Sequence, residues 1–397
     1  MLPYGRQSID DADIAAVIRA MQSDFLTCGP EVDAFEREFA QYLGAKHAVA
    51  VCNATAALHL AMVVADIGAG DRVVTSPNTF VASANCAAFV GAMPDFCDVE
   101  ADGFTLDAVL LETGWQADTK AVVAVAYGGQ CADMPQIARV ARERGAIVIE
   151  DACHGSGGGF VHAGKSWKLG AHPWADMSVF SFHPVKTLTT GEGGMLVTDN
   201  DAYARRARLL RAHGLQRAAA EFEGFGVDCD PAYAERGPWV YEMHELGYNY
   251  RITDIQCALG RSQLGKLATF VERRREIVAR YNEAFAGIPW LRTPALRNPL
   301  DRDEISWHLY TVLMDFDALG KTRTEVMAEL RSKDVGSQVL YIPVHLQPWY
   351  RKTYGYSHGK CPVAEAQYRQ SLSLPLFPAL TPADLNQVIH AVKALNP

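Results

Sequence analysis

Seven short runs of mostly apolar, often β-branched residues recur through the first two thirds of the chain, and amphipathic stretches separate them. The runs predict strands at residues 48–52, 73–76, 93–98, 121–126, 146–150, 178–182 and 194–198. Helical periodicity between them predicts helices that include 56–65, 135–144 and 201–213. Because continuously apolar strands separated by helices are typical of buried parallel strands, we expect an α/β fold with a mostly parallel sheet covered on both faces.

The pattern changes after this region. A loop rich in glycine, proline and acidic residues covers about 215–245, and a long helical stretch rich in Arg and Glu follows at 253–285. Beyond it, strands are predicted at 308–315 and 337–342, with helices at 323–333 and 382–395. We therefore expect a large domain at 1–260, which includes the N-terminal segment, and a smaller C-terminal α/β domain at 261–397.

Composition narrows the function to small-molecule chemistry. Apolar residues make up 49% of the 397 residues and charged residues 21%, as in ordinary globular proteins. The net charge of −9 argues against nucleic-acid partners and gives no attraction to anionic lipid. No secretory signal, no apolar run of about 18 residues and no zinc-like cysteine spacing occurs. We expect a cytoplasmic enzyme with free thiols, no metal and no membrane contact.

Ligands of parallel sheets gather at the carboxyl ends of the strands, so the residues that follow each run are candidates for chemistry. After the first run, the small residues Cys52-Asn53-Ala54-Thr55-Ala56 join a predicted strand to a helix. Backbone N–H groups at such a helix N-terminus can bind a phosphate. Small residues at such a turn also serve close packing, and the segment alone does not decide between the two interpretations.

Two other strand ends carry ionisable side chains. In VIEDACHG, Asp151 follows an apolar strand, where a carboxylate needs a cationic partner such as a protonated pyridine nitrogen, unless it caps the following turn. His154 follows three residues later and can equally be a core histidine. In SVFSFHPVK, Lys186 lies among apolar and aromatic neighbours, where a lowered pKa would make its amine a nucleophile, although most lysines are solvated surface residues.

A phosphate-binding helix N-terminus, a strand-end carboxylate and a later strand-end lysine are together the three attachment points of pyridoxal 5′-phosphate. With them, the chain resembles the DegT/DnrJ/EryC1/StrS family of sugar aminotransferases over essentially its whole length. The matching segments are FLTCGP, HAVAVCNATAALHLA, SPNTFVASAN, IEDACHGSG, VFSFHPVKTLTTGEGGMLVT, ELGYNYRITDIQCALG and SLPLFPAL. The resemblance implies a fold-type I pyridoxal-phosphate transferase whose large domain has a seven-stranded, mostly parallel sheet.

The resemblance also implies roles for individual residues. Lys186 is expected to hold the cofactor covalently and to move the proton during transfer, while Asp151 keeps the pyridine nitrogen protonated. The other expected cofactor contacts are His154, Phe80, Ala54, Thr55, Ser181 and Asn249. Because the family supplies the residue matching Asn249 from the neighbouring subunit, a homodimer with shared sites is implied. The expected sugar-nucleotide contacts are Tyr4, Asp24, Thr27, Tyr341 and Pro343.

The segments GPWVYEMHELGYNYRITDIQ and YIPVHLQPWYR resemble the family branch that makes UDP-4-amino-4,6-dideoxy-N-acetyl-β-L-altrosamine, an intermediate of pseudaminic acid. That branch implies amino transfer from L-glutamate to C4 of a UDP-linked 4-keto-6-deoxy-N-acetyl-hexose. Leu340 departs from the pattern, because similar proteins commonly have histidine there. The alternatives are another C4 or C3 sugar aminotransferase, a sugar 3-dehydratase, which Lys186 speaks against, and a non-catalytic cofactor-binding regulator.

Overall fold

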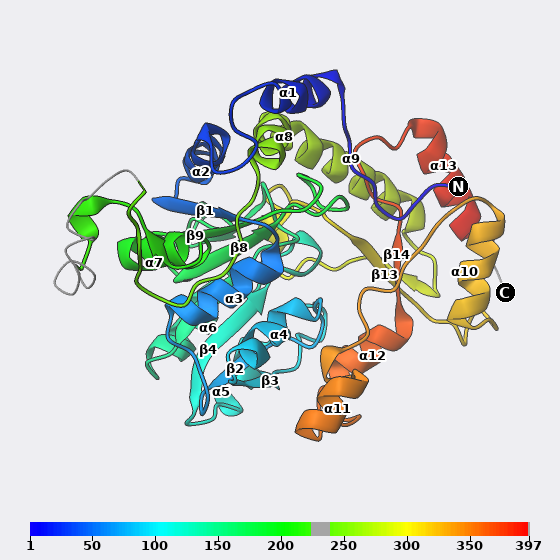
Figure 1. Cartoon of the computed structure of the whole chain (residues 1–397). Helices are drawn as coiled ribbons and strands as arrows, with labels where there is room; N and C mark the ends of the chain where they lie inside the picture. The colour runs from blue at the N-terminus through cyan, green and yellow to red at the C-terminus, as the bar shows by residue number, and fades with distance from the viewer. Residues whose placement is uncertain (224–238, 396–397) are drawn as a thin grey trace.

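The computed structural model describes residues 1–223 and 239–395, and a seven-stranded sheet lies at the centre of the larger part of the chain (Figure 1). Its strand order is β1-β9-β8-β5-β4-β2-β3. The strands are β1 (His47–Val51), β2 (Arg72–Thr75), β3 (Met93–Phe96), β4 (Thr119–Val125), β5 (Ile147–Asp151), β8 (Met177–Ser181) and β9 (Gly194–Thr198). Only β9 runs antiparallel to its neighbours, β1 and β8. The predicted seven-stranded, mostly parallel sheet is confirmed.

Helices cover both faces of this sheet, as the apolar runs predict. Alternate residues of β4 enter different cores: Val122 and Ala124 pack toward one face, and Ala121 and Val123 toward the other. The first core includes side chains of α2 (Pro30–Leu43) and α6 (Met134–Arg142). The second includes side chains of α3 (Ala54–Val64), α4 (Ala82–Phe89) and α7 (Asp201–Leu210). Strands buried on both faces explain why the sequence pattern has long apolar runs rather than simple alternation.

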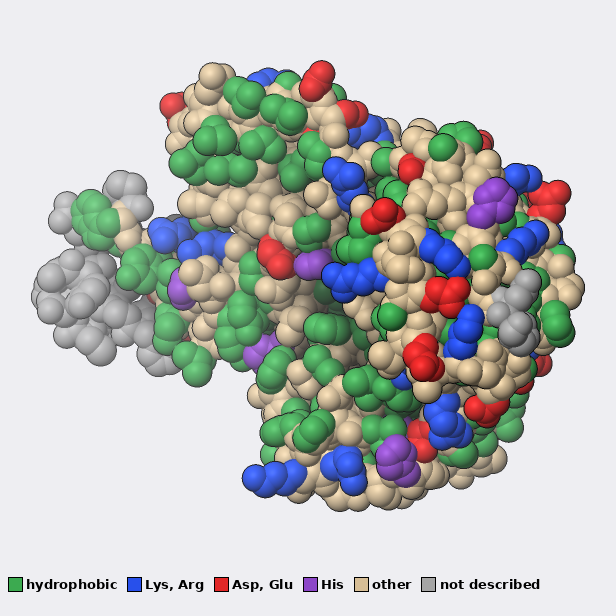
Figure 2. Space-filling view, turned by 90° about the vertical axis from the view of Figure 1, so that its right-hand side faces the viewer, with side chains coloured by type: hydrophobic (Ala, Val, Ile, Leu, Met, Phe, Trp, Pro, Cys, Tyr) green, Lys and Arg blue, Asp and Glu red, His purple; other side chains and the backbone are tan. Residues whose placement is uncertain are grey.

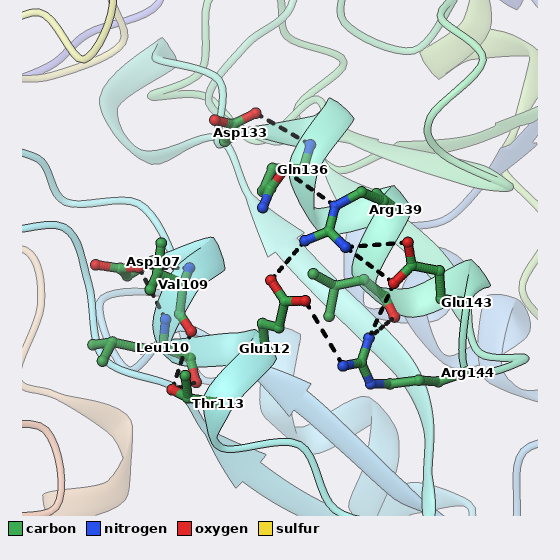
Figure 3. Close-up of polar contacts among 11 residues, drawn as sticks. Asp107, Val109, Leu110, Glu112, Thr113, Asp133, Gln136, Arg139, Glu143 and Arg144 are labelled. Carbon is green, nitrogen blue, oxygen red and sulfur yellow. Dashed lines mark hydrogen bonds and ion pairs between the residues drawn. The ribbon is translucent and has the colours of Figure 1, made fainter.

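An ion cluster joins α6 to the short helix α5 (Ala108–Thr113) at the surface (Figure 3). Arg139 bonds Glu112 of α5 at 2.6 Å and Glu143 at 3.0 Å. The carboxylate of Asp107 caps the start of α5 by accepting the N–H groups of Val109 and Leu110. These contacts hold α5 against α6 away from the carboxyl ends of the strands, so the cluster has a structural role.

The C-terminal part has its own core around a small antiparallel sheet of β12 (Leu291–Arg292), β13 (Tyr310–Met314) and β14 (Ser371–Leu374). The helices α10 (Arg323–Ser332) and α13 (Pro382–Lys393) pack on it. The predicted strand at 337–342 is wrong: the segment makes one bridge, between Gln338 and Ser373, and then leaves the sheet. Alternation alone could not show that residues 371–374 are the partner of β13.

The predicted helix at 253–285 is two helices, α8 (Asp254–Leu264) and α9 (Leu267–Phe285). The break falls at Gly265 and Lys266, and the Lys266 amine binds Asp10 and Asp13 beside α1 (Asp11–Met21). Helix α9 connects the two parts, because Leu267 and Val271 belong to the first core of the large sheet while Ile277 and Phe285 belong to the C-terminal core (Figure 1). The division at 260/261 remains a proposal, and α9 itself spans both cores.

The remaining elements are short or peripheral. They are β6 (Gly159–His162), β7 (Lys165–Lys168), β10 (Leu215–Gln216), β11 (Glu242–Met243), α11 (Pro348–Tyr354), α12 (Pro362–Gln370) and the 3-10 turns at Tyr127–Gly129, Ala219–Glu221, Pro299–Asp301 and Val344–Leu346. The predicted polar loop at 215–245 falls partly outside the described residues. At its N-terminus the chain pairs Leu2 with Val335 of the C-terminal part before it crosses to α1 (Figure 1).

Among the described residues, the face shown in Figure 2 carries no patch of one dominant charge. Acidic and basic side chains are interspersed over the face that the C-terminal part presents in Figure 2. Among the described residues, no helix combines the length and the apolar character needed to cross a bilayer. The eight cysteines in these residues are unpaired, and Cys229 lies outside them.

Arg274 of α9 ties the C-terminal part together from inside. Its side chain is fully buried, and its Nη1 donates to the carbonyls of Trp307 and His308 at 3.3 Å and of Leu376 at 2.9 Å. Among the described residues it has no carboxylate partner, and burial lowers its pKa to about 10. We expect Arg274→Ala to lower the free energy of unfolding by roughly 3 kcal/mol, because a buried acceptor left unpaired costs about 1–3 kcal/mol.

Urea unfolding followed by circular dichroism measures this effect. The matched control is Arg280→Ala on the same helix, where an exposed ion pair with Glu283 should leave the unfolding midpoint unchanged. Equal midpoints for both variants would contradict the assigned role of Arg274.

Candidate active site

A cavity of about 540 Å³ lies where β4, β5 and β8 end, between these strand ends and the C-terminal part. Nine of the thirteen residues that the sequence nominates line it. They are Tyr4, Ala54, Thr55, Phe80, Asp151, His154, Ser181, Lys186 and Tyr341. The carboxyl ends of neighbouring parallel strands meet at one edge of a sheet, which is why residues more than a hundred positions apart converge here.

The N-terminus of α3 forms one wall of the cavity and is suited to an anion. The Asn53 side chain caps the helix by accepting the Ala56 N–H at 2.9 Å. Within the described residues, the N–H groups of Ala54 and Thr55 meet no acceptor, so both are free to bind a ligand's phosphate. Gly194 of β9 makes room for this turn, since a Cβ there would lie 2.6 Å from the Ala54 nitrogen.

Asp151 is a buried carboxylate held only by neutral donors. Its Oδ2 accepts the Ser83 hydroxyl at 2.6 Å, and its Oδ1 accepts the Cys153 N–H at 3.1 Å. The Ser83 hydroxyl uses its hydrogen in the bond to Asp151. The Thr79 hydroxyl oxygen lies 2.6 Å from that of Ser83 and must therefore be the donor between the two. Asp151 has no ion-pair partner in the part of the chain that the structure describes. A buried carboxylate in this state suits a ligand that brings a positive charge.

Lys186 lies opposite Asp151, in the tight turn after β8, where its backbone N–H donates to the His183 carbonyl. Burial lowers the pKa of its amine, and the nearby Asp151 and Cys153 only partly oppose that shift. A lowered pKa leaves more of the amine neutral at physiological pH and therefore nucleophilic. The environment inferred from SFHPVK, apolar and enclosed, is the one that the structure shows.

His154 is held as one neutral tautomer. The Gly128 N–H donates to its Nδ1 at 3.2 Å, so the proton must be on Nε2, which faces the Tyr341 hydroxyl at 3.2 Å. Burial and the charge of Lys186 lower the pKa of His154 well below its ordinary range. The Tyr341 hydroxyl thus accepts a hydrogen bond from His154, and its own O–H can donate to a group in the cavity.

A second histidine, His308, supports the first and was not found from the sequence. Its ring lies 4.4 Å from that of His154, centroid to centroid, and is buried. It comes from the segment before β13, and its backbone N–H donates to the Gly128 carbonyl. No sequence motif points to His308, because it lies about 150 residues after His154 and reaches it only through the packing of the C-terminal part. Ser83 and Thr79 were missed as well, although both lie in the quoted segment SPNTFVASAN.

The C-terminal part closes the cavity through one loop. The Tyr127 hydroxyl donates to the Leu340 carbonyl, and the Val344 N–H donates to the Pro77 carbonyl at 3.0 Å. These contacts fix Leu340 and Tyr341 in the wall, with the Tyr341 ring 6.1 Å from that of Phe80. Leu340 therefore presents an apolar side chain to the cavity.

Four nominated residues lie outside the cavity of their own chain. Asp24 and Thr27 are exposed, and Thr27 pairs with Thr253. Pro343 is buried at the start of a 3-10 turn and supports the Tyr341 loop without lining the cavity. Asn249 is exposed, and its backbone bridges Ala212 at the end of α7. The first three residues do not line the cavity of their own chain, and their assignment to the sugar-nucleotide cleft stays a prediction.

The chain matches known proteins over almost its whole length. The profile of the DegT/DnrJ/EryC1/StrS aminotransferase family matches residues 7–393. The spore coat polysaccharide biosynthesis protein SpsC of Bacillus subtilis is 40% identical over 393 residues, which are 99% of this chain and 96% of that protein.

Solved structures share the fold over the whole chain. The putative sugar aminotransferase Spr1654 of Streptococcus pneumoniae in its PMP-form has a TM-score of 0.89 at 28% identity, with 100% of this chain and 99% of that chain covered. Its PLP-form has a TM-score of 0.87 at 27% identity, with 99% and 98% covered. Helicobacter pylori PseC, an aminotransferase involved in the biosynthesis of pseudoaminic acid, has a TM-score of 0.87 at 26% identity, with 99% and 98% covered.

The contacts of His154 predict its protonation state. At about pH 6 an ordinary histidine, with a pKa of about 6.5, is mostly protonated. We expect His154 to remain neutral at that pH with its proton on Nε2, since burial and Lys186 both oppose a second proton. Nitrogen-15 NMR of the imidazole groups measures this directly, with the exposed His358 as an internal reference. An imidazolium signal from His154 at about pH 6 would refute the tautomer assignment.

Proposed function

The chain belongs to the DegT/DnrJ/EryC1/StrS aminotransferase family, and from that premise we propose that it transfers an amino group to a nucleotide-linked keto-sugar. The observation that carries the proposal is the convergence of Lys186, Asp151 and the α3 N-terminus on one cavity. The fold alone would not decide the function, because folds of this kind serve many reactions. The function is therefore argued from the side chains that line the cavity.

Pyridoxal 5′-phosphate is the cofactor of this enzyme class, and the residues present fit it. The free N–H groups of Ala54 and Thr55, with the Ser181 hydroxyl, suit its phosphate. The buried carboxylate of Asp151 has neutral donors and suits a pyridinium. When bound, the cofactor supplies a ring that accepts electrons from the reacting carbon and a carbon that carries the amino group between donor and acceptor.

Each residue of the site then has a definite task. The Lys186 amine holds the cofactor and, once released, takes a proton from the donor's carbon and later returns one to the sugar carbon. Asp151 keeps the ring nitrogen charged, and Ser83 and Thr79 keep the Asp151 oxygens in place. The Nε2–H of His154 donates to the Tyr341 hydroxyl, and Phe80 packs against the face of the cofactor ring. Tyr341 orients the sugar with its free hydroxyl proton.

For the substrate we propose a UDP-linked 4-keto-6-deoxy-N-acetyl-hexose, with L-glutamate as donor and UDP-4-amino-4,6-dideoxy-N-acetyl-β-L-altrosamine as product, an intermediate of pseudaminic acid. The support is the resemblance of 237–256 and 341–351 to that branch and the similarity to PseC. The apolar walls formed by Leu340 and Val185 suit a deoxy sugar.

A second candidate acceptor follows from another observation. SpsC, at 40% identity, is a spore coat polysaccharide protein, and the Leu340 wall differs from the histidine common in similar proteins. A different keto-sugar used in polysaccharide assembly is therefore the alternative acceptor. A reducing, cytoplasmic setting suits either substrate, since the cysteines of the described residues are all unpaired.

A homodimer with shared sites completes the proposal. Asn249 is exposed and lies outside the cavity of its own chain, where it is free to reach a neighbour's phosphate site. Apolar side chains nearby are also exposed: Leu246 is 82% exposed and Met243 63%. Exposed apolar residues beside Asn249, which is proposed to bind the cofactor phosphate of a neighbour, are consistent with a subunit interface.

The first functional prediction concerns Lys186. We expect the purified protein to bind the cofactor covalently, with label on Lys186 after borohydride trapping and peptide mapping. Lys186→Ala should lose the link and lower turnover by at least about 10²-fold, the size of a lost acid–base group. The substrate test is L-glutamate with a panel of UDP-4-keto-6-deoxy sugars, with products identified by mass and NMR. Label on another lysine, or no amino sugar from any panel member, would sink the proposal.

The second concerns the dimer. Lys186→Ala retains Asn249, while Asn249→Asp retains the lysine but places a negative charge beside the phosphate, so each homodimer should be nearly inactive. A mixed dimer contains one site with both groups intact. Mixing the variants under subunit exchange should therefore restore activity toward one working site per dimer. Confirmed exchange by mass spectrometry without recovery, or full activity of Asn249→Asp alone, would rule out shared sites.

A further inference from the structure

A buried histidine and a buried glutamate form a pair outside the main cavity. His345 belongs to the 3-10 turn Val344–Leu346, and its side chain is fully buried. Its Nε2 lies 2.9 Å from Oε1 of Glu365 on α12, whose side chain is 7% exposed. Neither residue lines the main cavity, and the proposed transfer reaction uses neither of them.

The contacts of His345 fix its protonation state. Its Nδ1 is buried and meets no partner among the described residues, so a proton there would be an unpaired donor. Burial lowers the pKa of His345, and Glu365 only partly opposes that shift. At neutral pH His345 is therefore neutral, and its single ring proton is on Nε2, which donates to Glu365.

Glu365 holds its charge through neutral donors. Besides His345, its Oε1 accepts the N–H of Gly359 at 2.9 Å and the N–H of Cys361 at 3.4 Å. Burial raises the pKa of Glu365, but these hydrogen bonds outweigh burial and leave the pKa below its ordinary value. Removing the His345 donor would leave a buried charge with one partner fewer, which is costly.

Helix α12 begins on the large domain. The carboxylate of Asp98, two residues after β3 ends, accepts the N–H groups of Val363 and Ala364 at 2.8 and 2.9 Å. The ring of His345 lies 5.9 Å from that of Phe96, the last residue of β3, centroid to centroid. The histidine–glutamate pair therefore lies against the large sheet, whose strand ends carry the cavity residues.

The same helix also bonds the segment that carries Phe80. The Nδ2 of Asn78 donates to Oε1 of Gln367 at 3.0 Å, and both side chains are buried. Asn78 is two residues before Phe80, which lines the cavity. Helix α12 thus holds the segments of two cavity residues, Phe80 and Tyr341, whose rings lie 6.1 Å apart.

A short, stiff segment connects His345 to Tyr341, four residues earlier. Pro343 lies between them and has a restricted φ, and its carbonyl accepts the Leu346 N–H at 2.9 Å, which closes the turn. A displacement of His345 is therefore passed on to Tyr341. The Tyr341 hydroxyl would then move away from Nε2 of His154, which lies 3.2 Å from it.

We propose that His345 is a positioning residue for the sugar substrate: its bond to Glu365 holds the Tyr341 hydroxyl where it accepts from His154 and donates to the sugar. The inference rests on the proposed function and deepens it. A misplacement of about 1 Å is enough to cost an oriented contact much of its effect. The donor half of the reaction, in which Tyr341 orients no sugar, does not depend on the pair.

The test compares His345→Gln and His345→Phe with the wild type, each as full-length, cofactor-loaded enzyme. Glutamine keeps an N–H donor for Glu365, whereas phenylalanine keeps the ring against Phe96 and loses the donor. We expect His345→Phe to raise the KM of the UDP-4-keto-6-deoxy sugar about tenfold, because one oriented hydrogen bond is lost, and His345→Gln to restore most of the affinity. The absorbance change of the cofactor with L-glutamate alone should be the same in all variants.

A second measurement needs no substrate. The Nε2 proton of His154 reports the position of the Tyr341 hydroxyl, to which it is hydrogen-bonded. In nitrogen-15 NMR, we expect His345→Phe to move this proton resonance upfield and to speed its exchange with solvent. Tyr341→Phe, which removes the acceptor itself, should give the same change, and His345→Gln should keep the wild-type resonance. His154→Gln assigns the signal.

His358→Gln is the matched control. His358 is the other imidazole at Glu365, with Nδ1 3.5 Å from Oε2, but its side chain is 72% exposed. It lies outside the Tyr341 loop, so its replacement should leave the KM of the sugar and the His154 resonance unchanged. Thermal unfolding checks that each variant is folded. If His345→Phe does not fold, His345→Asn, which is too short to reach Glu365, takes its place.

The outcomes separate positioning from a structural role. A folded His345→Phe variant with a lower melting temperature, but with wild-type sugar KM and His154 resonance, would overturn the inference. An equal loss in the glutamate half of the reaction would overturn it as well, because the whole cavity would then be disturbed. If the wild type converts no keto-sugar, the proposed function fails, and the positioning of Tyr341 is decided by the His154 resonance alone.

Discussion

The parallel pairing of β5 with β8 is the constraint on which the site depends. It sets the ends of the two strands side by side, so that Asp151 and the turn holding Lys186 face each other across one cavity. Strand β9 then returns antiparallel, and Gly194 permits it to lie against the start of α3. The main-chain hydrogen bonds of the sheet therefore fix the positions of Asp151, Lys186 and the N-terminus of α3.

The C-terminal part shapes this arrangement rather than merely covering it. Arg274 holds the carbonyl of His308, and the His308 ring in turn packs against His154. From the other side, Tyr127 anchors the loop that carries Tyr341. The protonation state of His154 therefore depends on groups from both parts of the chain, and a shift of one part relative to the other would alter the cavity wall.

Charge is distributed unevenly between two hollows of the chain. The main cavity combines the buried carboxylate of Asp151 with one amine of lowered pKa, that of Lys186, which suits a cofactor that brings its own positive charge. A smaller hollow, lined by Arg208, Arg211, Arg251 and Asp33, has arginines in excess of carboxylates.

The sequence by itself determined the sheet, the family and the groups attached to strand ends. Apolar runs give buried parallel strands, and the residues after those runs must lie at one edge, so Asp151 and Lys186 could be nominated from the chain alone. What only the tertiary structure decided involves contacts between distant segments. The pairing of β13 with β14 joins segments about sixty residues apart within the C-terminal part, and the place of His308 behind His154 depends on how the two parts of the chain pack. Local periodicity encodes neither contact. The loop residues Asp24 and Thr27 show the same limit, because a loop's direction is set by its tertiary contacts and not by its own pattern.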